Sequence, residues 1–246
     1  MNLRKVFIIA TLTIPWTGYA QTQINKSIPI QSGQRILMRF DFPELIKVST
    51  WDKNEISIQG SVSINNGEND DAFELQTSTS GNTVSIRNEI KNMKSLPHRY
   101  TVVDGSQKVV FKNREEFEKY QAEHGRGFDM VSSGIDMDIL LEIKVPRNVQ
   151  TDVESVHGMV EITDFSGPLH VEAIHGGVDA ALVEKATGQI IAETNFGDIY
   201  TNLDVKFGST KSSDRDFHTF VSAKPGTGPD YTFESKFGNV YIRKAK

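Results

Sequence analysis

The residues VESVHGMV at 153–160 give the strongest indication of the fold, because the chain repeats their pattern three more times. The copies read VEAIHGGV at 171–178, AETNFGDI at 192–199 and FESKFGNV at 233–240. Their glycines follow one another at steps of 18, 21 and 41 residues, and 41 is about two turns of one period. A period of this length is typical of repeat architectures, in which each unit stacks on its neighbours.

Each copy predicts two short strands joined by a turn at the glycine, which reaches backbone conformations that strain other residues. A unit this small cannot bury its own apolar side, so we expect the units to stack with their strands in register. Equivalent residues then form columns. The aliphatic column that should face inward is Val160, Val178, Ile199 and Val240, and a narrow column beside it is Ser155, Ala173, Thr194 and Ser235.

The rest of the chain predicts further strands and one helix. Alternating apolar residues predict strands at 36–40, 46–49, 55–64, 73–77, 83–87 and 138–145. Residues 94–134 are rich in charge and show little strand pattern, but Asn113 with Glu116 predicts a helix cap and Gly125 a helix end. We expect the irregular residues 204–228 to fill the space of a turn missing between the last two copies.

The N-terminus predicts a signal peptide over residues 1–20. Arg4 and Lys5 precede a nine-residue apolar stretch, and Gly18 and Ala20 offer the small residues that a signal peptidase reads. The alternative is a buried N-terminal strand. With the signal peptide, the mature chain would be a single domain over 21–246 with an insertion at about 94–134, exported to the periplasm or the cell surface.

Composition excludes several classes of protein. The 246 residues include 27 basic and 32 acidic side chains, a net charge of -5 that is too balanced for a nucleic-acid coat. Without cysteine, neither a disulfide framework nor a thiolate metal site can form. No apolar run reaches the ~18 residues that a spanning helix needs, so we expect no membrane span in the mature chain. No cofactor is expected.

Two segments resemble a family of exported bacterial β-strand-repeat proteins. They are VSTWDKNEISI at 48–58 and IKVP at 143–146, which runs into residues 152–154 and the glycine turns. That "domain of unknown function" family carries the label "putative adhesin" and is related to the auto-transporter adhesin head, or GIN, domain. The resemblance covers about residues 27–90 and 138–246. It implies an all-β fold, a right-handed single-stranded β-helix or β-solenoid with one short helical insertion, and it carries over no catalytic residue.

The second position of each copy is a glutamate, so the stack should carry an outward column of carboxylates. The column is Glu154, Glu172, Glu193 and Glu234. Like charges at strand spacing repel, and a divalent cation or a basic partner would relieve the repulsion. The other interpretation is a solvated face whose carboxylates splay apart and are screened by salt.

A second candidate column begins with His157 and His175, which occupy equivalent positions. Two imidazoles on neighbouring units are weak candidates for Zn²⁺, because a zinc site needs at least three protein ligands. The column continues with Phe196 and Phe237, which cannot bind a metal. That substitution favours an aromatic packing ladder beside the turns.

The insertion mixes aromatic rings with guanidinium groups, the residue types enriched at interface hot spots. The candidates for binding are Arg99, Tyr100, Arg114, Phe117 and Tyr120. The alternative is that these aromatic residues clamp the insertion onto the solenoid.

No catalytic constellation can be assigned, since the chain has no nucleophile elbow, no cysteine and no identifiable acid–base pair. The favoured function is a non-enzymatic envelope protein that presents a stacked β-surface to a protein or glycan ligand. The alternatives are a periplasmic structural or regulatory partner that acts through residues 94–134, and a glycan-active β-helix enzyme. The oligomeric state is not indicated.

Overall fold

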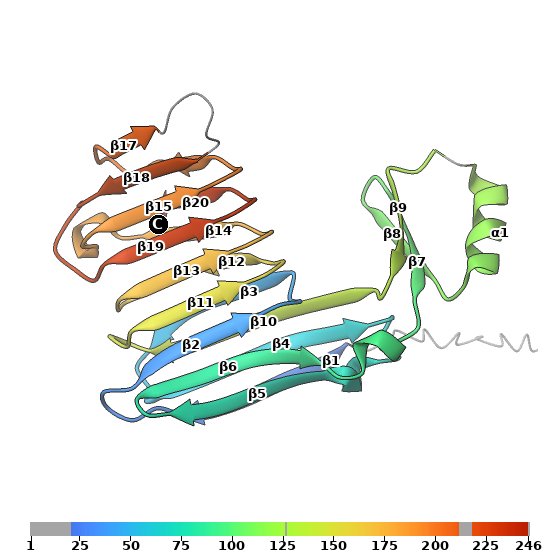
Figure 1. The fold of residues 1–246 in the computed structure, drawn as a ribbon, viewed down its shortest axis with the longest axis horizontal. Helices are drawn as coiled ribbons and strands as arrows, with labels where there is room; N and C mark the ends of the chain where they lie inside the picture. The colour runs from blue at the N-terminus through green and yellow to red at the C-terminus, as the bar shows by residue number, and fades with distance from the viewer. Residues whose placement is uncertain (1–20, 126, 212–217, 246) are drawn as a thin grey trace, which may run out of the picture.

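The computed structural model describes residues 21–125, 127–211 and 218–245, so the predicted signal peptide lies outside the described residues. The chain forms two large sheets in two layers and a small third sheet that projects from one side (Figure 1). Sheet 1 contains, in spatial order, β1 (Thr22–Pro29), β4 (Glu55–Ile64), β10 (Met137–Pro146), β3 (Leu45–Trp51), β12 (Met159–Ile162), β14 (Val178–Leu182), β20 (Val240–Lys244) and β16 (Ile199–Thr201).

Sheet 2 contains β17 (Gly208–Lys211), β18 (Thr219–Ala223), β15 (Ile190–Thr194), β19 (Tyr231–Ser235), β13 (Leu169–Ala173), β11 (Thr151–Ser155), β2 (Arg35–Phe40), β6 (Thr83–Ile90) and β5 (Phe73–Ser80). Sheet 3 contains β8 (Gln107–Phe111), β7 (Arg99–Asp104) and β9 (Met130–Gly134). One α-helix, α1 (Arg114–His124), and three short 3₁₀ helices, η1 (Asp70–Ala72), η2 (Met93–Ser95) and η3 (Glu184–Ala186), complete the described elements.

The core lies between sheets 1 and 2 and follows from alternation along the strands. Ile36 and Met38 of β2, in sheet 2, are fully buried, and so are Ile46 and Val48 of β3, in sheet 1. Successive strand residues point to opposite faces, so the residues between these four point outward. The strands predicted in the first half of the chain are confirmed as β2 to β6 and β10.

Each repeated octapeptide forms the end of a sheet-2 strand, a turn, and the start of a sheet-1 strand. We call such a pair of strands with its turn a rung. The strands of neighbouring rungs pair in parallel and in register, for example Val153 with Val171 and Val160 with Val178. The two inward columns are confirmed: all their members are buried except Ile199, which is half-buried.

The rungs are not stacked in chain order. Sheet 2 runs β11, β13, β19, β15, so the fourth copy lies between the second and the third. The glycines follow the same order, with Gly238 against Gly176 and Gly197 against Gly238. Residues 204–228 therefore do not replace a missing turn, and the prediction that they do is wrong. They contain the antiparallel strands β17 and β18, which add to the outer side of β15.

The all-β class is confirmed, but the single-stranded β-helix is not. A β-helix adds one turn after another along the chain, whereas here the last copy inserts between two earlier ones. Both large sheets also have antiparallel strands at one end, β1 and β4 in sheet 1 and β5 in sheet 2, and sheet 2 has β17 and β18 at its other end. The repeats thus form only the parallel part of a mixed two-layer sandwich.

The insertion contains the predicted helix and three strands that were not predicted. Asn113 Oδ1 accepts a hydrogen bond from the Glu116 amide at 2.9 Å, and α1 ends at Gly125. These contacts confirm both helix signals. The strands β7, β8 and β9 pair only with one another among the described residues, so the interpretation of 94–134 as a stretch with little strand structure is wrong.

The insertion leaves the sandwich on the same side as the repeat turns. It connects β6 to β10, which pair in parallel with β2 and β3, the two strands of the neighbouring rung. It therefore occupies the place of a rung's turn. In Figure 1 it stands apart from the stacked rungs, with α1 on its outer side.

Candidate functional site

Four rings form a continuous exposed column along the repeat turns. His157 stacks on His175 with ring centroids 5.3 Å apart, and His175 stacks on Phe237 at 5.0 Å. Phe237 stacks on Phe196 at 5.2 Å, and the interplanar angles along the column are between 5° and 13°. All four residues are exposed, Phe196 at 56% and Phe237 at 45%. The predicted aromatic ladder is confirmed, in the order of the rungs rather than of the chain.

In the third and fourth copies, a small residue with a hydroxyl group fixes the turn that carries the ring. Ser235 Oγ accepts from the Gly238 amide at 2.9 Å and donates to the Gly176 carbonyl at 3.0 Å. Thr194 Oγ1 accepts from the Gly197 amide at 3.1 Å and donates to the Gly238 carbonyl at 2.9 Å. Each hydroxyl thus closes its own turn and bonds the turn of the next rung, which holds successive rings in line.

Two tyrosines lie just beyond the last two turns, on the outer face of sheet 1. Tyr200 stacks on Tyr241 with centroids 5.2 Å apart, and Tyr200 is 48% exposed. The Tyr200 hydroxyl donates to Asp198 Oδ2 at 3.2 Å, and this hydrogen bond raises the pKa of Tyr200. Asn239 Nδ2 donates to the Tyr241 hydroxyl at 3.1 Å. We call Phe196, Phe237, Tyr200 and Tyr241 the aromatic corner.

The stacking determines which part of each ring a ligand can reach. Parallel rings at this spacing cover each other's faces, so the inner rings His175 and Phe237 present their edges to solvent. Ring edges carry partial positive charge and pack well against carbonyl oxygens and apolar side chains. One cation is close: Lys236 Nζ lies 5.5 Å from the Phe237 ring centroid. The corner thus combines apolar area with the hydroxyl and amide groups of Tyr200, Tyr241 and Asn239.

The two histidines use their ring faces for packing within this column. Across residues 21–125, 127–211 and 218–245, no group of three or more His, Asp or Glu side chains lies close enough together to hold a metal ion.

The predicted glutamate column exists, and three of its four carboxylates contact a basic side chain of the same chain. The order across sheet 2 is Glu154, Glu172, Glu234, Glu193. Arg39 lies 3.3 Å from Glu154, His170 Nε2 lies 3.2 Å from Glu234, and His218 Nε2 lies 2.7 Å from Glu193. Within the described part of the chain, Glu172 has no such partner. Arg39 therefore offsets the charge of Glu154, while His170 and His218 carry a positive charge only when protonated, and an external cation or basic partner stays a prediction.

The candidate aromatic residues of the insertion pack α1 onto sheet 3. Tyr100 stacks on Phe117 at 5.4 Å, and Phe111 contacts both Phe117 and Tyr120, at 6.1 and 5.0 Å. Arg114 forms an exposed ion pair with Glu118 one helical turn away. The rings thus hold the insertion together internally, and the prediction that they clamp it onto the sandwich is wrong.

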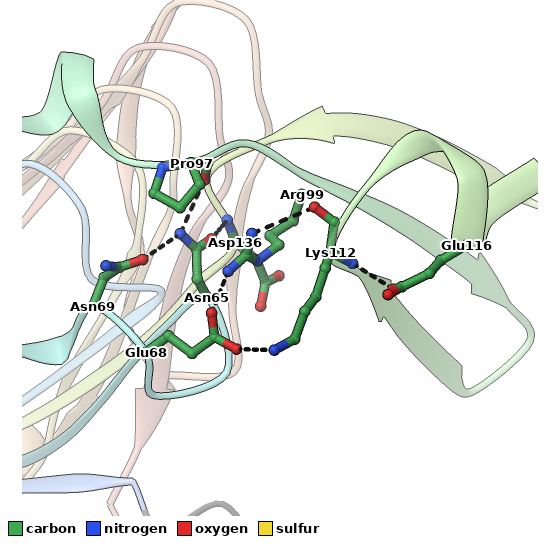
Figure 2. A network of polar contacts seen from close by, with 8 residues as sticks. All are labelled: Asn65, Glu68, Asn69, Pro97, Arg99, Lys112, Glu116 and Asp136. Atoms are coloured by element: carbon green, nitrogen blue, oxygen red, sulfur yellow. Dashed lines mark hydrogen bonds and ion pairs between the residues drawn. The ribbon is translucent and has the colours of Figure 1, made fainter.

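A polar network joins the insertion to the sandwich instead (Figure 2). Arg99, whose side chain is 7% exposed, lies 2.6 Å from Glu68, and Lys112 Nζ lies 2.6 Å from the other oxygen of the same carboxylate. Buried Asn65 donates to the Pro97 carbonyl at 3.0 Å and accepts from the Asp136 amide at 3.1 Å. Because these contacts reach both ends of the insertion, they hold it in one orientation.

Replacing Glu68 by Gln should loosen the insertion without unfolding the sandwich. The change keeps the shape of the side chain but leaves buried Arg99 without its counter-charge. Hydrogen exchange should become faster in β7 and β8 and stay unchanged in β2 and β11. Glu123→Gln, the same change at an exposed position of α1, is the matched control. Equal exchange in both variants would show that the ion pair does not hold the insertion.

The same contact predicts an effect of acid. Lys112 and Arg99 lower the pKa of Glu68 below its ordinary value of 4.5. The ionised Glu68 carboxylate therefore stabilises the docked insertion, and this contribution is complete at pH values above 4.5. It disappears as the pH falls through the lowered pKa of Glu68. The wild-type protein should therefore acquire the exchange pattern of Glu68→Gln only below pH 4.5, after correction for intrinsic exchange rates.

Comparison with known proteins gives two solved structures of low similarity. No family model matches the chain, and no curated protein matches it. A "putative cell adhesion protein" from Clostridium sporogenes is 9% identical over 92% of this chain and 100% of its own, with a TM-score of 0.46. A "putative adhesin" from Bacteroides fragilis is 14% identical over 92% and 98% of the chains, with a TM-score of 0.27. The family resemblance stays a prediction, and function has to be argued from the chain's own surface.

None of the helices in the described ranges is long and apolar enough to cross a membrane. Export and the cell compartment stay predictions from residues 1–20.

Proposed function

We propose that this chain is an exported, non-enzymatic binding protein that presents its stacked rungs to a protein ligand through the aromatic corner. The observation that carries the proposal is the exposed column of stacked rings, extended at its end by Tyr200 and Tyr241. Large, rigid aromatic side chains lose little conformational entropy on binding and dominate the energetics of protein interfaces. Holding Phe237 and Phe196 in line on hydrogen-bonded turns pre-organises this part of the surface before the ligand arrives.

The ring geometry favours a protein over a glycan. A sugar ring stacks on the face of an aromatic ring, and the two inner rings of this column, His175 and Phe237, have both faces stacked on neighbouring rings. Ring edges beside the Asn239 amide and the tyrosine hydroxyls suit a polypeptide, whose carbonyl oxygens and apolar side chains can contact both. Of the adhesin-like ligands predicted from the sequence, protein is therefore the one that we propose.

Site-directed photo-crosslinking tests this proposal. With a benzoylphenylalanine in place of Phe237, cells that express the protein should yield one specific cross-linked protein. The matched control places the same residue at Val183, which is 60% exposed and follows β14 at the opposite ends of the strands. Equal capture from both positions, or capture of nothing while purified protein binds a glycan, would contradict the proposal.

Truncation of the corner should then weaken binding of the captured protein. Tyr200→Ala and Phe196→Ala remove exposed rings, so neither should disturb the core. A hot-spot residue contributes about 2 kcal/mol or more, which corresponds to roughly thirtyfold in affinity. Val183→Ala is the control, and titration calorimetry with the captured protein is the measurement. A loss below about twofold in both ring variants would place the ligand elsewhere.

A second candidate function acts through the insertion, and the network around Arg99 favours it. A module held in one orientation by a buried ion pair can position a partner relative to the rungs. Crosslinking from an exposed position of α1, such as Glu123, separates this function from the first. Capture from Glu123 but not from Phe237 would favour the insertion.

A further inference from the structure

One of the two outer strands of sheet 3, β9, has an open and uncharged edge. Among the described strands β9 pairs only with β7, so its other side carries unpaired backbone groups. Met130 is 51% exposed and Val131 is 47% exposed, and the neighbouring Ser132 and Ser133 are exposed as well. The strand contains neither a charged residue nor a proline. An exposed uncharged edge of this kind is a template for pairing with another strand.

Two other outer strands, β1 and β8, carry features that block such pairing. In β1, Lys26 reaches across to the Leu75 carbonyl at 2.7 Å, and the strand ends in Pro29. On the other side of sheet 3, β8 carries Lys108, which pairs with Asp136 at 2.7 Å. Lysine, proline and inward-pointing charge are the usual protections of an edge strand. The lack of all three in β9 sets this edge apart from β1 and β8.

We propose that β9 pairs in antiparallel fashion with β9 of a second copy of this chain, which joins two insertions into one six-stranded sheet. The strand is five residues long and centred on Ser132, so self-pairing brings Ser132 opposite Ser132 of the partner and Val131 opposite Ser133. No like charges face each other in this register. One surface patch meets itself, as a two-fold dimer requires.

The surroundings of β9 suit this occupant. Sheet 3 has only three strands and α1 contributes no buried residue, so the insertion gains from any extension of its sheet. Val131 shares a face with Val102, its neighbour on β7. Its counterpart in the second copy would lie diagonally across, where exposed apolar area of both chains can become buried. The insertion stands apart from the stacked rungs (Figure 1).

Single cysteines test the pairing and its register, since the chain contains none. Directly opposed residues of antiparallel strands have Cα atoms about 4.5–5.5 Å apart, within the range of a disulfide. Ser132→Cys should therefore form a disulfide-linked dimer under mild oxidation at least about tenfold faster than the controls, because pairing raises the effective concentration. The first control is Ser78→Cys on β5, an exposed serine of another outer strand. The second is Val131→Cys, whose diagonal distance of about 7–8 Å is too long.

Sedimentation equilibrium of the full chain supplies a readout without oxidation. The wild-type protein should approach twice the mass of one chain as concentration rises. Ser132→Lys should keep the mass of a single chain, while Ser78→Lys should behave as the wild type. Any one of three results overturns the proposal. The first is a wild-type protein that keeps the mass of a single chain up to a protein concentration of roughly 100 µM. The second is the formation of disulfide-linked dimers at equal rates by Ser132→Cys and Ser78→Cys, and the third is a Ser132→Lys variant that still forms dimers. The test is independent of the aromatic corner, which none of these variants touches.

Discussion

A chain that ends at residue 230 should lose two rungs of the stack, although it lacks the strands of only one. The deleted strands, β19 and β20, lie inside both sheets, between β13 and β15 and between β14 and β16. Without them, β15 keeps only its pairing with β18, and β16 keeps no strand partner among those described. The deletion also removes the buried side chains of Tyr231, Phe233, Val240 and Ile242. At about 2 kcal/mol each, this loss approaches the whole stability of an ordinary domain.

Hydrogen exchange monitored by mass spectrometry measures the outcome. Protection should disappear in β15 and β18 and persist, at reduced strength, in β2, β3 and β11. A chain that ends at residue 244 retains both strands and is the control. The contrary result is a truncated chain in which β15 stays protected. That would mean that the third copy has moved to pair directly with the second, which their similar sequences allow in principle.

Gly238→Ala should destabilise the protein by about 3 kcal/mol or more, far beyond the ordinary cost of a surface substitution. A Cβ atom at this position would lie 1.8 Å from the Gly176 carbonyl oxygen and 2.6 Å from its carbon. Both obstacles are backbone, so they cannot rotate away as a flexible side chain could. One rung has to move from the next, which weakens the pairing of β14 with β20 and the packing of Phe237 on His175.

Denaturant unfolding of the variant and a matched control measures this effect. Gly208→Ala makes the same change in β17, where the nearest atom to the new Cβ would be 3.8 Å away. Its free energy of unfolding should stay within about 0.5 kcal/mol of the wild type, as for a neutral surface substitution. If the two variants unfold at the same midpoint, the glycines are not required by the close approach of the rungs.

Much of the repeat could be predicted from sequence because its signals are local. Alternation placed Val160 and Val178 inside and Glu154 outside, and the shared glycine located every turn. The equivalence of His175 and Phe237 indicated a packing ladder rather than a metal site, and the rings do stack. The cap at Asn113 also depends only on residues within one helical turn.

One missed element had a signal. Gly105-Ser106 lies between β7 and β8, and a glycine-serine pair between two runs of strand-forming residues is a hairpin signal. The abundant charges around it masked the short runs of valine. In contrast, β9 reads MVSSG and has little pattern of its own. It becomes a strand because β7 offers it hydrogen-bond partners.

The sequence by itself determined the class of this protein, the position of its turns, and which side of each repeated strand faces the interior. These properties follow from alternation and from glycine, which act over a few residues. The order of the rungs and the docking of the insertion through Arg99 and Glu68 were decided only in the tertiary structure. The four copies are chemically alike, so any copy can pair with any other. Their order depends on where the long connections of the chain can reach, which no short stretch of sequence encodes.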